Sequence, residues 1–230
     1  MKIDNIVKIK RLQIDRIKLK KMNQIIQDLN WRYAVKKYDS SKKIEEQDLA
    51  ILKETISLSP SSMGLQAYKV LVIENPEIRA KLQEKSFGQT QITEASHLFL
   101  FCGFTEITEE YIKLMVEKTA ETRNQALSEL EGFKKFLASK MTMDSDKLEI
   151  WTAKQTYIAL GHLMQTAAQL RIDSTPMEGF DPNGYNEVLN LSEKGLKANL
   201  VCTLGFRAEE DKYQHLQKVR KNHSDLFEII

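Results

Sequence analysis

Two basic stretches of this chain have side chains that could bind an anion. WRYAVKKYD, near residue 35, contains Arg32 and Lys36, and LQKVRKN, near the C-terminal end, contains Lys218 and Arg220. Guanidinium and ammonium groups bind phosphate through charge-assisted hydrogen bonds. Taken singly, each stretch also fits a solvated basic loop or a basic tail, so composition alone leaves both readings open.

A third stretch, SPSSMGLQAY, breaks a helical pattern with Pro60 and then presents Ser61, Ser62 and Gln66 before an apolar run. Hydroxyl groups in such a turn can cap neighbouring backbone groups. They can equally line the site of a planar polar ligand. The residues do not decide between these two roles.

The fourth stretch, PMEGF, places Glu178 between Pro176 and Gly179. Pro and Gly suffice for a turn, so the carboxylate is not needed to form one. It either caps or forms an ion pair within the turn, or it faces a ligand. The sequence contains no glycine-rich phosphate loop, no Gly-x-Ser-x-Gly motif and no His-Glu-x-x-His motif, which disfavours nucleotide-triphosphate, serine-hydrolase and zinc-protease chemistry.

Composition is that of a globular protein with one sizeable core. The chain has 230 residues, of which 42% are hydrophobic and 29% charged, with four Pro and nine Gly. No apolar run reaches the roughly 20 residues that span a bilayer. Cys102 and Cys202 lie in apolar runs, which predicts buried free thiols in a reducing cytoplasm rather than a disulfide or a metal pair.

The positive charge of the chain is concentrated at its start. Residues 1–21 contain eight Lys or Arg and two Asp, a net charge of +6 within a chain of net charge +2. The segment lacks the apolar core of a secretory signal. We expect residues 1–22 to form a poorly ordered basic extension and residues 23–230 to form a single domain, although a basic helix for membranes or nucleic acid has the same composition.

The remaining pattern mixes helices and strands around one sheet, with helices dominant. Helices are predicted at 25–32, 43–59, 76–87 and 184–192, and buried strands at 68–75, 97–104 and 196–206. Residues 107–140 read as a charged helical excursion with a break near 120–125. Residues 151–172 read as a long helix that is apolar nearly all round and therefore buried, in part against a second subunit.

The order of five motifs resembles that of the FMN-dependent nitroreductase family. They are R-x-x-x-K near the start, PSS…Q before a strand, GQTQITEASH before the next strand, PMEGFD after the long helix, and K-x-R near the end. The resemblance covers residues 23–225 and is greatest to the oxygen-insensitive NAD(P)H nitroreductase and dihydropteridine reductase branch. It implies an α+β fold, with a central, mostly antiparallel sheet wrapped by helices, in an intertwined homodimer.

The resemblance also implies a role for each polar stretch. Arg32, Lys218 and Arg220 would hold the FMN phosphate, and Lys36 would stabilise negative charge at the N1/O2 edge of the flavin. Glu178 and the Gly179 N–H would face the N5/O4 edge, so that Lys36 and Glu178 are the predicted catalytic residues. The predicted cofactor-binding set comprises Arg32, Tyr33, Ala34, Lys36, Ser61, Ser62, Gln66, Gln89, Gln91, Pro176, Met177, Glu178, Gly179, Lys218 and Arg220.

Ser61, Ser62 and Gln66 would reach the flavin from the other subunit. The chain departs from the family at Ala34, where a hydroxyl residue is common, and at Gln91, where relatives can have a second Lys. The missing positive charge at Gln91 leaves the redox potential of the flavin undetermined by the resemblance.

The implied activity is hydride transfer from NADH or NADPH through FMN to a small oxidant, a nitroaromatic or a quinone, with ping-pong kinetics. The implied protein is a cytoplasmic homodimer that needs no metal, nucleic acid or membrane. Reduction of a pteridine or an enone, or FMN binding without catalysis, remain alternatives. The sequence does not identify the physiological oxidant or choose between NADH and NADPH.

Overall fold

The computed structural model describes residues 23–230, so the predicted basic extension at 1–22 lies outside the described residues. Four strands, β1 (Tyr68–Ile73), β2 (His97–Phe104), β3 (Asp173–Met177) and β4 (Leu196–Gly205), form one sheet in the order β1-β2-β4-β3. All three strand pairs are antiparallel. The predicted α+β class with a central antiparallel sheet is confirmed.

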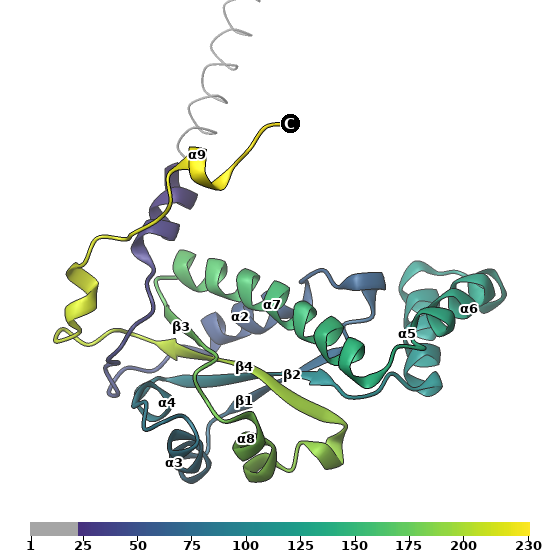
Figure 1. The fold of residues 1–230 in the computed structure, drawn as a ribbon, viewed down its shortest axis with the longest axis horizontal. Helices are drawn as coiled ribbons and strands as arrows, with labels where there is room; N and C mark the ends of the chain where they lie inside the picture. The colour runs from purple at the N-terminus through teal and green to yellow at the C-terminus, as the bar shows by residue number, and fades with distance from the viewer. Residues whose placement is uncertain (1–22) are drawn as a thin grey trace, which may run out of the picture.

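Helices cover both faces of the sheet (Figure 1). On one face α2 (Glu46–Ser57) and the 25-residue α7 (Ser145–Gln169) pack over side chains such as Phe99, Phe101 and Leu204. On the other face α3 (Pro76–Glu84), the short α4 (Gln91–Glu94) and α8 (Pro182–Leu189) pack over alternate residues of the same strands. Strand alternation thus provides two cores, one on each side of the sheet.

The charged excursion is a helical lobe beside the sheet (Figure 1). It contains α5 (Glu109–Arg123), a 3₁₀ turn η2 (Leu127–Leu130) and α6 (Glu131–Lys140), and it has its own small core. The break predicted near 120–125 is confirmed, because α5 ends at Asn124 in the left-handed conformation with φ 52°. Shorter helical turns are η1 (Ser62–Gly64), η3 (Ser192–Lys194), η4 (Lys212–His215) and α9 (His223–Leu226).

The long helix predicted at 151–172 corresponds to α7, and within one chain only part of its surface is buried, so its burial against a second subunit stays a prediction. Leu160, Leu163 and Ala167 of α7 are buried against the sheet, but Tyr157 and Ile158 are 42% and 40% exposed. Apolar periodicity cannot distinguish a face covered by the same chain from one that the chain leaves open.

Strand β3 was not predicted, because its sequence DSTPM is polar and contains Pro176. The prediction that Pro176 shapes a loop is therefore wrong, since it belongs to this strand and pairs with Cys202. β3 is an edge strand, and a proline is tolerated there because its missing N–H need not face a neighbour.

Both thiols are fully buried and unpaired, as predicted. Burial raises the pKa of Cys102 and of Cys202 to about 12, so both stay protonated at neutral pH. Within residues 23–230, no helix combines the length and apolarity needed to cross a membrane.

Candidate functional site

The structure brings together the cations of the two basic stretches, although they are almost 190 residues apart in sequence. A helix over residues 23–31 ends immediately before Arg32. Lys218 donates from its Nζ to the carbonyl oxygens of Leu29, at 2.5 Å, and of Arg32. The C-terminal segment therefore crosses the end of this helix and places Arg220 close to Arg32.

The electrostatics of this cluster, Arg32, Lys218 and Arg220, fit a bound anion. Burial lowers the pKa of Lys218, and the positive charges of Arg32 and Arg220 lower it further. Burial likewise lowers the pKa of Arg32, with Arg220 contributing. The Nε of Arg32 is buried and makes no hydrogen bond, and in the part of the chain that the structure describes no carboxylate forms an ion pair with any of the three. A phosphate dianion would satisfy this donor and relieve the repulsion.

A stacked set of aromatic and basic side chains holds the cation cluster against the sheet. The guanidinium of Arg207 lies 4.4 Å from the Trp31 ring centroid and 4.5 Å from that of Tyr33. Arg207 also donates to both carboxylate oxygens of Asp173, at 2.5 and 3.0 Å, at the start of β3. Trp31 and Tyr33 flank Arg32, so this stack fixes the backbone from which Arg32 extends.

A second ion pair anchors the helix that precedes Arg32. Asp28 is buried and pairs with Arg171 at 2.8 Å, and the guanidinium of Arg171 lies 5.1 Å from the Trp31 ring centroid. The indole thus contacts two guanidinium groups, each neutralised by its own buried aspartate, which is a favourable cation–π arrangement.

The backbone after Arg32 is held by Asp211. The Oδ2 of this buried carboxylate accepts hydrogen bonds from the amides of Lys36, at 2.7 Å, and of Lys37, at 3.1 Å. Burial acts to raise the pKa of Asp211, but the amides of Lys36, Tyr213 and Lys37 outweigh it and lower the pKa. The Lys36 side chain is exposed, so a fixed backbone presents its ammonium group at the surface.

A buried hydroxyl network joins the same segment to β3 and β4. The Tyr38 hydroxyl makes hydrogen bonds to Thr175 Oγ1 at 3.1 Å and to the Thr203 carbonyl at 3.0 Å. Thr175 Oγ1 donates in turn to the carbonyl of Val35 at 2.9 Å. Residues 33–38 therefore lie rigidly along the end of the sheet next to β3.

The PMEGF stretch follows β3 and exposes a carboxylate between two buried anchors. Met177 and Phe180 are buried, and the Phe180 ring packs 4.6 Å from the Tyr185 ring. Between them Glu178 and Gly179 are exposed, and Gln89 Nε2 donates to the Gly179 carbonyl at 2.6 Å. Tyr157 of α7 donates its hydroxyl to Glu178 Oε1 at 2.5 Å.

The hydroxyl-rich stretch lies elsewhere in the chain. The Ser62 amide donates to Gln155 of α7 at 2.7 Å, and Ser61 Oγ accepts from the Gln66 amide at 2.8 Å. Met63 and Gln66 have φ of 56° and 44°, an unusual conformation for residues other than glycine. Figure 1 shows this stretch on the side of the sheet toward α5, whereas residues 23–36 and the C-terminal segment lie at the opposite end.

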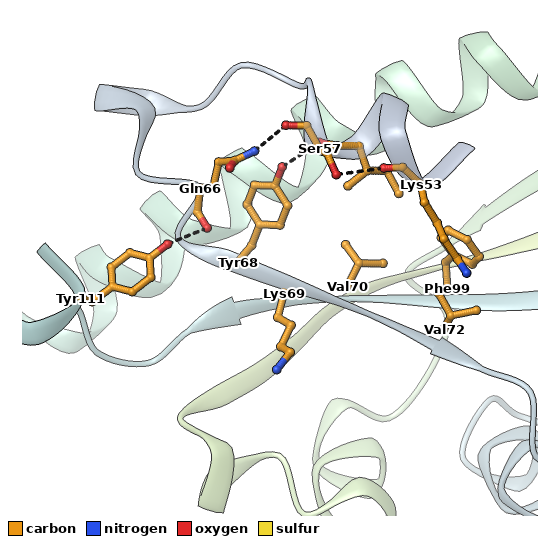
Figure 2. Close-up of a pocket in the computed structure, with 10 residues that line it drawn as sticks. Lys53, Ser57, Gln66, Tyr68, Lys69, Val70, Val72, Phe99 and Tyr111 are labelled. Carbon is orange, nitrogen blue, oxygen red and sulfur yellow. Dashed lines mark hydrogen bonds between the residues drawn. The ribbon is translucent and has the colours of Figure 1, made fainter. Parts of the chain in front are cut away.

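A cleft of about 460 Å³ lies between α2 and the free edge of β1. Figure 2 shows Tyr68, Val70 and Val72 on one side of β1, with Lys69 pointing away on the other side. The remaining walls of the cleft include Lys53, Phe99 and Gln66. The cation cluster and Glu178 do not line it, so this cleft is separate from the polar site around residues 32 and 178.

Comparison with known proteins identifies the family of the chain. The sequence model of the nitroreductase family matches residues 29–206. The chain belongs to the nitroreductase family. Both the Arg32 segment and the PMEGF stretch fall within the matched range.

Relatives in this family resemble the chain over nearly its full length. A Staphylococcus saprophyticus protein with the provisional name NAD(P)H nitroreductase is 36% identical over 219 residues, which cover 91% of this chain and 98% of the relative. The major NAD(P)H-flavin oxidoreductase of Aliivibrio fischeri is 33% identical over 214 residues, covering 90% and 98%. The crystal structure of an Exiguobacterium sibiricum protein, provisionally a nitroreductase and in complex with FMN, superposes with a TM-score of 0.75 at 18% identity, covering 90% and 97%.

The predicted site residues therefore form three groups within one chain. Arg32, Lys218 and Arg220 meet at the helix end, Gln89, Glu178 and Gly179 meet after β3, and Ser61, Ser62 and Gln66 lie apart. Tyr33, Ala34 and Lys36 join the first group to the sheet, while Met177 and Gln91 are buried.

Sequence reasoning missed the side chains that position these groups, namely Trp31, Asp173, Arg207, Asp211 and Tyr157. Tyr157 offered one signal, since a tyrosine in an apolar stripe has a hydroxyl that needs a partner. The others offered none, because their partners are distant in sequence.

We expect Asp173→Asn to lower the free energy of unfolding by about 3 kcal/mol. Arg207 is largely buried, and the substitution replaces its negatively charged partner with a neutral amide. Urea denaturation followed by circular dichroism measures this loss. Glu117→Gln is the matched control, since it removes the same charge from an exposed pair with Lys113 and should leave the midpoint nearly unchanged. Equal, small effects of both substitutions would contradict the assigned role of Asp173.

Proposed function

We propose that this protein is an FMN-dependent NAD(P)H oxidoreductase that reduces small nitroaromatics or quinones. The observation that carries the proposal is the cluster of Arg32, Lys218 and Arg220, with no carboxylate paired to it among the described residues and with a buried, unpartnered Nε. Its chemistry suits the phosphate of FMN. The names of the relatives from S. saprophyticus and A. fischeri support NAD(P)H as the electron donor.

Bound FMN would supply two-electron transfer between NAD(P)H and an organic oxidant, chemistry that no side chain provides. The chain's own residues bind and orient. Arg32, Lys218 and Arg220 would hold the phosphate, and residues 33–36 would run beside the ribityl chain, with Ala34 contributing main-chain groups only. The rigid anchoring of this segment to Asp211 and Thr175 fixes the position of whatever it binds.

Lys36 and Glu178 would act at opposite edges of the flavin ring. The exposed ammonium of Lys36 extends from a backbone held by Asp211 and would stabilise negative charge at the N1/O2 edge. Glu178 is an exposed carboxylate held between buried Met177 and Phe180, and it would accept a hydrogen bond at the N5/O4 edge. Gln89 steadies Gly179 in the same turn.

We infer that the working unit is a homodimer. The exposed face of α7 carries Ile150, Tyr157 and Ile158, and a side chain at Gly161 would meet nothing within 4 Å, so another helix can approach closely there. The C-terminal segment leaves the body of the molecule (Figure 1), with Phe227 largely and Ile230 fully exposed, and β1 has a free edge beside the cleft of Figure 2. A second copy would cover these surfaces.

The dimer also accounts for the separated hydroxyl stretch. Ser61, Ser62 and Gln66 lie away from the cation cluster of their own chain, so they would complete the flavin site of the partner. Gln155 and Tyr111, which bond to Ser62 and to the carbonyl of Leu65, would hold this stretch in its unusual backbone conformation.

The purified protein should show a flavin absorbance spectrum, or acquire one on adding FMN, and the spectrum should bleach when NADH or NADPH is added without oxygen. Re-oxidation by a nitroaromatic or a quinone should restore it, and initial-rate plots should give parallel lines. Bound FMN that neither nucleotide reduces would favour a binding protein without catalysis. No FMN binding at all would refute the proposal.

Ile158→Arg should convert the dimer to a monomer and abolish FMN binding, because it places a charge in the proposed helix interface. Light scattering after size exclusion gives the molar mass, and absorbance gives the flavin content. Glu84→Arg on α3, an exposed position on the other face of the sheet, is the control and should change neither. A monomeric wild-type protein with full flavin content would contradict the two-subunit site.

A further inference from the structure

A side-chain hydrogen bond, from Tyr157 to Glu178, joins the long helix to the turn after the edge strand. Tyr157 extends from the middle of α7, the longest helix among residues 23–230, and Glu178 lies in the turn that follows β3. The two side-chain oxygens are 2.5 Å apart, the distance of a strong charge-assisted hydrogen bond to a carboxylate. A tyrosine hydroxyl is a fitting partner, because its ring has few rotamers and is carried by a rigid helix.

Nothing else in the described residues orients the Glu178 side chain. Its carboxylate forms no ion pair with any of residues 23–230, and its hydrogen bond from Tyr157 involves Oε1 alone. Burial, and next the hydrogen bond to Glu178, raise the pKa of Tyr157 to about 12. Tyr157 therefore remains the proton donor of the pair across the neutral range, and Oε2 remains free to accept a further hydrogen bond.

We propose that Tyr157 is the positioning residue for Glu178: it holds Oε1 so that Oε2 is presented to the ligand bound beside Gly179. The inference rests on the proposed flavin site, and it adds a residue of α7 to that site. An exposed glutamate without this bond would sample several rotamers, and the acceptor at the edge of the ligand would be lost for part of the time.

The role differs from a structural one in a way that can be measured. A residue that acts only through the Glu178 carboxylate should matter only while that carboxylate is present. A residue that supports packing of α7 should matter equally with or without it. Comparing Tyr157→Phe in the wild-type and Glu178→Gln backgrounds separates these cases, because Phe keeps the ring and removes one hydroxyl.

The experiment uses full-length protein loaded with FMN and measures three quantities: the FMN dissociation constant, the midpoint potential of the bound flavin at fixed pH, and the rate of its reduction by saturating NADPH. We expect Tyr157→Phe to leave the dissociation constant within about twofold and to slow reduction about tenfold, the usual effect of losing one charge-assisted hydrogen bond. The midpoint potential should become more negative, because the reduced cofactor loses a well-placed acceptor.

In the Glu178→Gln background the same substitution should change neither the rate nor the potential. Tyr213→Phe is the matched control, since this tyrosine has similar exposure and its hydroxyl makes no hydrogen bond among the described residues; it should behave as wild type. Equal effects of Tyr157→Phe in both backgrounds, or no effect in either, would overturn the proposal.

If Tyr157→Phe fails to bind FMN, Tyr157→His tests the same role with a side chain that can still donate, and failure of that variant to recover flavin reduction would overturn it too. Absence of FMN binding by the wild-type protein is a different result, which rejects the flavin site itself and not the role of Tyr157.

Discussion

The ion pair between Arg207 and Asp173, with Trp31 stacked on the same guanidinium, is the interaction on which the site depends. It joins three segments that lie far apart in sequence: the end of the first helix, the start of β3 and the residues after β4. Asp173 is almost fully buried, and an unpaired charge there would be costly, so the pairing is strongly favoured once the sheet forms. Arg32 directly follows Trp31 in the chain. The contact between Trp31 and Arg207 therefore also fixes the backbone from which the Arg32 guanidinium extends.

The constraint extends along β3. At the start of the strand Asp173 fixes the positively charged end of the candidate site, in its middle Thr175 fixes residues 35–38, and at its end the chain turns into Glu178 and Gly179. One short edge strand therefore sets the spacing between a positively charged end and an acidic end. In the proposed function, the phosphate of FMN would lie at the positively charged end.

The sequence singled out the polar residues of the candidate site but not the side chains that support them. Arg32, Lys218 and Arg220 also fit a basic loop or tail and were assigned to the site by the family resemblance, whereas the Glu178 carboxylate exceeds what a turn needs. β3 escaped prediction because a short, polar strand containing a proline lacks the alternation that marks a strand. The apolar periodicity of α7 does not reveal which of its faces the same chain covers and which it leaves exposed. Asp173, Asp211 and Tyr157 act through long-range contacts that only the folded chain shows.

The most direct test of this account is to compare the dissociation constants of FMN and riboflavin, which differ only in the phosphate. The account predicts that FMN binds on the order of 100-fold more tightly than riboflavin, from charge-assisted hydrogen bonds worth about 1.5–3 kcal/mol each. It also predicts that this preference largely disappears in a variant combining Lys218→Met and Arg220→Met. Equal affinity for the two flavins in the wild-type protein would show that the cation cluster does not hold the phosphate, and would contradict the account.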